Sequence, residues 1–87
     1  MSVSEKIKAG LKLEDRKIDE LAKMFGISRP SMSNKFHRES FSAEDLIKIA
    51  DFLGYSLTLV GGKHSITFDM GDIKPKDKKM SENGNQF

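Results

Sequence analysis

Polar side chains suited to contacts with DNA bases follow one another between residues 28 and 38 of the 87-residue chain. An arginine guanidinium can donate two hydrogen bonds to O6 and N7 of guanine, and an asparagine amide can pair with N6 and N7 of adenine. Short serine hydroxyls can bond to bases or to phosphates. The predicted base-reading residues are therefore Arg29, Ser31, Ser33 and Asn34.

The same stretch has the charge that phosphate binding requires. It carries Arg29, Lys35 and Arg38 and no acidic residue, and local positive charge is the electrostatic footprint of a nucleic-acid-binding face. Three charges alone also fit an ordinary solvated helix face. Serine is strongly preferred at helix N-caps, so we favour a capping role for Ser28 over a DNA contact. The predicted phosphate contacts are Arg16, Lys17, Ser28, Lys35, His37 and Arg38.

These side chains need two short helices joined by a tight turn. Gly26 lies where the first helix must stop, because glycine enters the left-handed conformation without a Cβ penalty. Ser28 is placed to cap the second helix. Met32 and Phe36 are four residues apart and share the face that must be buried. Residues 18–36 therefore predict a helix-turn-helix, in which the second helix enters the DNA major groove.

The motif resembles that of the phage repressor and Cro family. In that family an alanine, a glycine four residues later and an apolar residue six further on recur, and here they are Ala22, Gly26 and Met32. The resemblance covers roughly residues 4–60 and departs from the family pattern at Ile18 and Lys35. It implies a mostly α-helical, repressor-like domain of four to five helices.

Two further helices are predicted around this pair. Apolar residues at intervals of four predict a helix over residues 3–13. Ser42 is an N-cap followed by acidic residues in the first turn, and Gly54 is a left-handed C-terminal cap, so another helix is expected between them. These elements together predict a helical domain over residues 1–54.

After Gly54 the hydrophobic period changes from about four to two, as in a strand. Alternating runs on both sides of Gly61-Gly62 predict a β-hairpin over residues 55–70. An isolated hairpin is marginal in water, so its apolar face must either cover the helices of its own chain or pair with a second copy. In a Cro-like homodimer, the predicted dimerisation residues are Tyr55, Leu57, Leu59, Ile66, Phe68 and Met70.

The remaining composition argues against other classes of protein. There is no cysteine, the two histidines are isolated, and no nucleophile motif is present, so we expect no metal, no cofactor and no enzyme. No apolar run approaches the ~20 residues that cross a bilayer, and the N-terminus lacks a signal-peptide core, which predicts a cytoplasmic protein without a membrane partner. Residues 71–87 are largely polar and predict a disordered tail that can engage a protein partner.

The predicted function is a sequence-specific, double-stranded-DNA-binding transcriptional regulator, interpreted as a repressor. As a homodimer it would recognise two half-sites about one DNA turn (~34 Å) apart. One alternative is the antitoxin of a toxin–antitoxin pair, with the same DNA face and a tail that neutralises a toxin. The other is a protein–protein interaction module in which the motif serves only packing.

Overall fold

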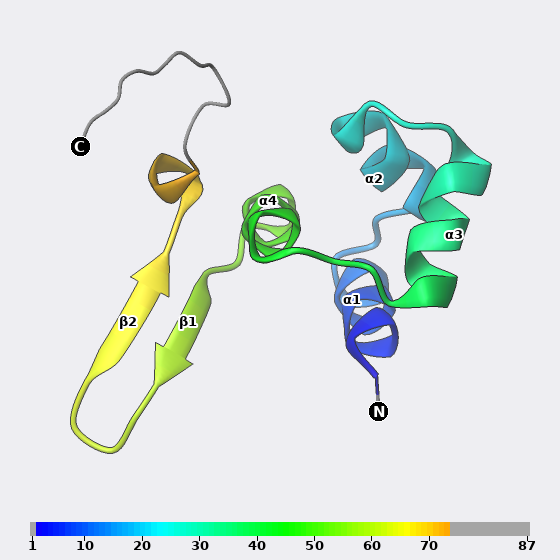
Figure 1. The fold of residues 1–87 in the computed structure, drawn as a ribbon. Helices are drawn as coiled ribbons and strands as arrows, with labels where there is room; N and C mark the ends of the chain where they lie inside the picture. The colour runs from blue at the N-terminus through cyan, green and yellow to red at the C-terminus, as the bar shows by residue number, and fades with distance from the viewer. Residues whose placement is uncertain (1, 74–87) are drawn as a thin grey trace, which may run out of the picture.

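Four helices precede a β-hairpin in the computed structural model, which describes residues 2–73 (Figure 1). The helices are α1 (Val3–Leu13), α2 (Ile18–Phe25), α3 (Arg29–Arg38) and α4 (Ala43–Leu53). The strands β1 (Leu57–Val60) and β2 (Ser65–Phe68) are followed by a short 3₁₀ helix, η1 (Met70–Asp72). The predicted fold class, a mostly α-helical helix-turn-helix domain with a C-terminal hairpin, is confirmed.

Side-chain caps fix where three of the helices begin. At α1, Ser2 Oγ accepts the N–H of Glu5 at 3.1 Å, and Glu5 in turn accepts the N–H of Ser2 at 3.0 Å. Ser42 and Asp45 form the same reciprocal pair at α4. Ser28 caps α3. Because each cap of this kind typically contributes ~1 kcal/mol, the serines define the helix boundaries.

The hydrophobic core lies where the four helices meet. Leu21 of α2 and Met32 of α3 are its most enclosed side chains, with no exposed surface (0%). Gly10 allows α1 to approach α4 closely, because a Cβ atom at this position would lie 3.1 Å from Cδ1 of Leu53. The other buried members of the core are Ile7, Leu11, Ala22, Phe36, Ile49 and Leu53.

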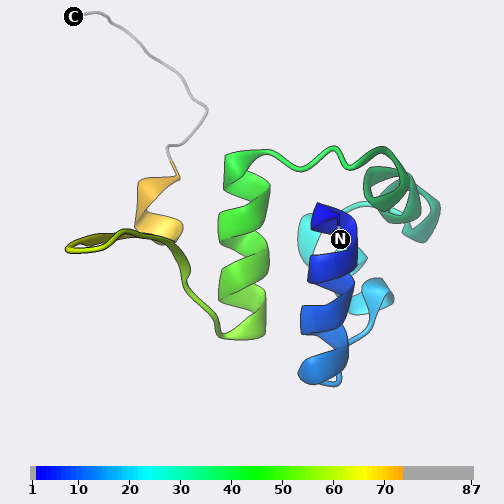
Figure 2. The same ribbon diagram turned by 90° about the horizontal axis from the view of Figure 1, so that it is seen from below.

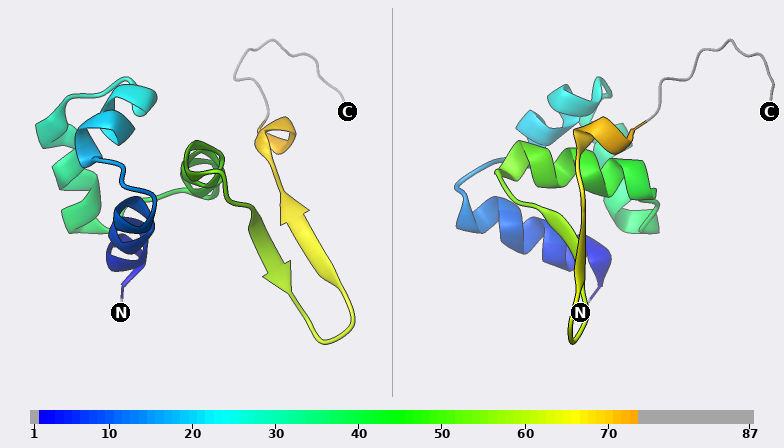
Figure 3. Two further views of the ribbon diagram at one scale, coloured as in Figure 1. Left: turned by 180° about the vertical axis from the view of Figure 1, so that it is seen from behind. Right: turned by 90° about the vertical axis from the view of Figure 1, so that its left-hand side faces the viewer.

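The β-hairpin extends from one side of α4 (Figure 3). Its antiparallel register pairs Leu57 with Phe68 and Leu59 with Ile66, so these four side chains share one face of the ribbon. Leu57 and Phe68, next to α4, are partly buried. Leu59 and Ile66, further along the hairpin, remain 60% and 58% exposed. The helices of the same chain therefore cover only the base of the predicted apolar face.

The hairpin and α3 lie at opposite ends of the molecule (Figures 1 and 3). Seen from below, α1 and α4 stand side by side between them (Figure 2). A partner bound at the hairpin end would consequently leave α3 accessible.

The predicted tail, residues 71–87, starts within η1 (Met70–Asp72). There the carboxylate of Asp69 accepts the N–H of Gly71 at 2.9 Å, which orders the first residues of the predicted tail. Residues 74–87, and with them the predicted disorder and partner contact, lie outside the described part of the chain. Within residues 2–73, no helix has both the length and the apolar composition to cross a membrane.

Candidate nucleic-acid interface

A tight turn sets the angle between α2 and α3. Gly26 has a φ of 71°, in the left-handed region, and its N–H bonds to the carbonyl of Lys23 at 3.0 Å. The N–H of Ile27 bonds to the carbonyl of Ala22 at 3.1 Å. Ala22 is itself buried as a member of the core. The turn predicted from the glycine is therefore present.

Hydroxyl groups organise the first turn of α3. Ser28 Oγ accepts the N–H of Ser31 at 3.2 Å, which confirms Ser28 as the N-cap. The two side-chain oxygens are also within hydrogen-bonding distance, at 3.0 Å. Capping thus engages both Ser28 and Ser31, and their remaining hydrogen-bonding capacity faces solvent.

α3 separates its apolar residues cleanly from its polar ones. Met32 and Phe36 are buried, and they anchor the inner face of the helix in the core. Helix spacing puts Arg29, Ser33 and His37 along one exposed row, with the other polar positions beside it. Every predicted base-reading residue is exposed to solvent, namely Arg29, Ser31, Ser33 and Asn34.

A cleft of about 410 Å³ beside this row brings in a residue that the sequence analysis missed. Lys8 of α1 lines the cleft together with Arg29, Ser33 and His37. Its ammonium lies 5.6 Å from the ring centroid of Phe36, a cation–π arrangement that holds it beside α3. Lys8 is therefore a further candidate for a phosphate contact. Lys8 reaches this position only because α1 packs beside α3, so the sequence around Lys8 does not predict the contact.

Arg29 is not free in the structure. Its guanidinium donates to the carboxylate of Asp19, which lies in the first turn of α2. Both side chains remain more than half exposed, at 55% and 67%, so the pair is accessible to water and to an incoming ligand. A guanidinium has five N–H donors, so Arg29 can keep one bond to Asp19 and still present others to a base.

Arg16 is likewise paired, at the start of α2. Its Nε donates to the carboxylate of Glu20 at 2.6 Å, and its guanidinium lies 4.0 Å from the ring centroid of Phe52 on α4. The bond from Arg16, followed by that from the backbone N–H of Lys17, lowers the pKa of Glu20. Carboxylates thus occupy the N-terminus of α2, which the helix dipole would otherwise offer to a phosphate.

Lys35 makes the most enclosed of these pairs. Its ammonium donates to Asp45 at 2.9 Å and to the carbonyl of Ser40 at 3.0 Å, and the paired side chains are only 26% and 19% exposed. Partial burial raises the pKa of Asp45, but the N–H of Ser42 and the ammonium of Lys35 outweigh it, and the pKa is lowered. Lys35 therefore ties the end of α3 to the start of α4.

Most of the chain matches one known protein family. The model of the bacteriophage CI repressor helix-turn-helix domain matches residues 3–66, which include all four helices and β1. The chain belongs to this family. Members of the CI repressor family are DNA-binding regulators, so the chain is a DNA-binding transcription regulator, as predicted. No curated protein and no solved structure matches it.

In this CI repressor domain the predicted phosphate-binding residues differ in their partners. Arg16 and Lys35 each have a carboxylate partner. Over residues 2–73, no ion pair involves Lys17, His37 or Arg38, and all three are exposed. Lys35, His37 and Arg38 also lie in the last turn of α3, where positive charge is favoured by the helix dipole. Among the predicted phosphate contacts, Lys17, His37 and Arg38 therefore have the side chains most available to DNA.

The described residues hold no candidate metal centre. Between residues 2 and 73, no group of three or more histidine, cysteine, aspartate or glutamate side chains is close enough together to bind a metal ion.

Proposed function

We propose that this CI repressor domain is a transcriptional repressor that binds two inverted DNA half-sites as a homodimer. The observation that carries the proposal is the division of α3, whose buried Met32 and Phe36 fix the helix while its polar side chains face outward. A recognition helix needs this arrangement, because its base-reading side chains must project from a rigid support. Occupancy of the operator would then exclude other proteins from the same DNA.

Base reading is assigned to the exposed polar residues of α3. Arg29 would contact guanine and Asn34 adenine, with Ser31 and Ser33 as shorter hydrogen-bonding partners. Lys17, His37 and Arg38 would bind phosphates, and Lys8 would join them beside the Arg29 row. Ser28 would contact phosphate while it caps α3. Arg16 and Lys35 would reach phosphate only by sharing or leaving their carboxylates.

The homodimer is assigned to the hairpin. Leu59 and Ile66 leave an apolar face exposed on its outer part, and the hairpin lies at the end of the molecule away from α3, so pairing there would leave both reading helices accessible. The proposed contact residues are Tyr55, Leu57, Leu59, Ile66, Phe68 and Met70. A regulator of this type would act in the cytoplasm, where its DNA target lies.

The salt dependence of binding tests the DNA-binding step. Purified protein is titrated into a labelled DNA duplex at several salt concentrations, and the observed association constant is measured by fluorescence anisotropy. We expect a steep loss of affinity with salt, because each phosphate contact contributes a slope of about −0.9 to the log–log plot. Binding that is absent at low salt, or that has a slope near zero, would contradict the proposal.

The two alternatives have different support. Family membership favours DNA binding over an interaction module without a DNA role. The antitoxin alternative depends on residues 74–87, outside the described part of the chain, and it stays a prediction from the sequence.

A further inference from the structure

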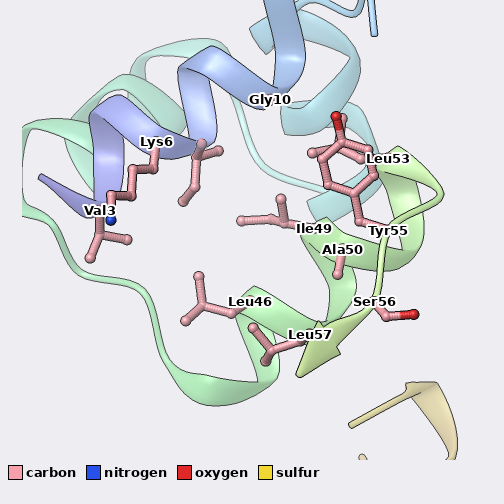
Figure 4. Close-up of a pocket in the computed structure, with 11 residues that line it drawn as sticks. Val3, Lys6, Gly10, Leu46, Ile49, Ala50, Leu53, Tyr55, Ser56 and Leu57 are labelled. Carbon is pink, nitrogen blue, oxygen red and sulfur yellow. The ribbon is translucent and has the colours of Figure 1, made fainter. Parts of the chain in front are cut away.

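An open apolar groove lies between α1, α4 and the start of β1, and its volume is about 280 Å³ (Figure 4). Val3 on α1 lies across the open space from Leu46 on α4 and Leu57 on β1 (Figure 4). The hydroxyl of Tyr55, another lining residue, is bonded to Glu14 at 2.9 Å. The walls of the groove are therefore largely hydrophobic, and an apolar ligand surface would fit them better than water.

The groove continues into the exposed face of the hairpin. Leu57 belongs to both surfaces, because it lines the groove and shares its strand face with Leu59 and Ile66. Leu59 and Ile66 are more than half exposed, and Val3 at the opposite wall is 47% exposed. One continuous apolar surface thus runs from Val3, across the groove, to the outer part of the hairpin.

We propose that a second copy of the chain fills this groove, with the Leu59–Ile66 part of each hairpin lying in the groove of the other copy. The inference rests on the proposed homodimer and specifies its contact surface. A twofold axis brings the same patch of both subunits together. Because this patch contains both a groove and a projecting apolar hairpin, each hairpin can fill the groove of the other copy, and the same contact forms twice. Pairing of strand edges alone would leave the groove uncovered.

The available apolar area fits a small, weak interface between two copies rather than one of standard size. A whole buried aliphatic side chain corresponds to roughly 60–120 Å² of apolar surface. Applied to the exposed fractions of Val3, Tyr55, Leu59, Ile66 and Met70, this gives roughly 150–300 Å² of apolar surface per copy. Standard interfaces bury about 800 Å² per partner, of which about 65% is apolar in homodimers. Leu57 and Leu46 in the groove wall add to the apolar surface of each copy.

The hairpin supplies a matched control at Val60. This side chain is 80% exposed, more than Leu59. Val60 pairs with Ser65 and projects from the opposite face of the ribbon to Leu59, away from the groove. A charge at Val60 should therefore leave the proposed contact intact, whereas a charge at Leu59 should be buried in it.

Sedimentation equilibrium of three glutamate variants tests the surface. We expect Leu59→Glu and Val3→Glu each to weaken dimerisation by at least about 30-fold, because each would bury an unpaired carboxylate in an apolar contact. Val60→Glu should change the dissociation constant by less than about threefold, as is usual outside the energetic centre of an interface. Circular dichroism melts confirm that the variants are folded. A loss of dimer in Leu59→Glu without any effect of Val3→Glu would overturn the groove contact.

Cysteine cross-linking separates this inference from the homodimer itself, and the natural chain has no cysteine to interfere. Val3→Cys and Leu59→Cys proteins are mixed in equal amounts and oxidised. The proposal predicts a disulfide between the two different variants. Cross-links confined to Leu59→Cys pairs would support a dimer through hairpin edges and overturn the groove contact. No cross-link, with a monomer mass at every concentration, would contradict both the groove contact and the proposed homodimer.

Discussion

At the scale of single residues, Arg29 and Asn34 lie on the exposed side of α3 in different surroundings. Arg29 is bonded to Asp19 of α2, so its guanidinium is oriented before DNA arrives. Asn34 lies one position after Ser33 in the helix and faces solvent. A change at Asn34 therefore tests the proposed hydrogen bonds to bases. A change at Asp19, the partner of Arg29, tests the charge around the exposed polar residues of α3.

Replacement of Asn34 by alanine should remove one base contact in each half-site. We expect Asn34→Ala to cost roughly 1–3 kcal/mol of binding free energy and to relax discrimination at one base position. Anisotropy titrations against a selected site and its single-base variants measure both effects. Because Asn34 is exposed, the unfolding midpoint should not move. Unchanged affinity and unchanged base preference would contradict the assignment.

Neutralisation of Asp19 should release Arg29 and remove a negative charge beside the reading surface. We expect Asp19→Asn to raise affinity for all duplexes and to make the salt slope steeper, because Asp19 no longer neutralises the charge of Arg29 beside the DNA. Asp51→Asn is the matched control, because it changes the net charge equally from an exposed position on α4, next to the hairpin side of the molecule. Equal effects of the two variants would show that only net charge matters.

At the scale of elements, the corner between α3 and α4 depends on Lys35 and Asp45. We expect Lys35→Met to lower the free energy of unfolding by roughly 1–2 kcal/mol, between the values typical of exposed and buried ion pairs, since it leaves Asp45 without its cation. Arg38→Met, four residues from Asn34 and in no ion pair of residues 2–73, should leave stability unchanged and reduce the salt slope. Urea unfolding separates the two effects, and equal stability of both variants would contradict the structural role of Lys35.

The same corner predicts how stability changes with pH. The pKa of Asp45 is lowered in the folded state, despite partial burial, by the N–H of Ser42 and by Lys35. A carboxylate with a lowered pKa stabilises the fold above its unfolded pKa, and this contribution is lost as the pH falls. We expect the free energy of unfolding to decline between about pH 5 and pH 3, and to decline less in Asp45→Asn. An identical decline in the variant would exclude Asp45 as a contributor.

Across the whole molecule, the features that could be predicted from the sequence are the helix ends and the hairpin, because each depends on residues close together in the chain. Gly26, Ser28 and Ser42 act within one helical turn of their own positions, so the ends of the helices follow from the residues themselves. The alternation around Gly61-Gly62 likewise fixes the hairpin and its apolar face, because strand register follows from a period of two.

What the sequence could not predict depends on tertiary packing. Arg29 and Asp19, and Lys35 and Asp45, are each ten residues apart on different helices, so no helical period reveals that these cations are paired. Lys8 lies beside Arg29, Ser33 and His37 only because α1 packs beside α3. The groove likewise forms only when α1, α4 and β1 come together. These features decide which side chains are left for the proposed DNA contacts and where the proposed second copy would bind.

Selection of bound sequences from a pool of random duplexes tests whether two copies of α3 read two DNA half-sites. The enriched sequences are predicted to contain two inverted copies of one short motif, with centres about 10 base pairs (~34 Å) apart. In the Asn34→Ala protein, the preference at one position of each copy should be lost. Enrichment of a single unrepeated motif would contradict the dimeric arrangement, and no enrichment at all would contradict sequence-specific binding.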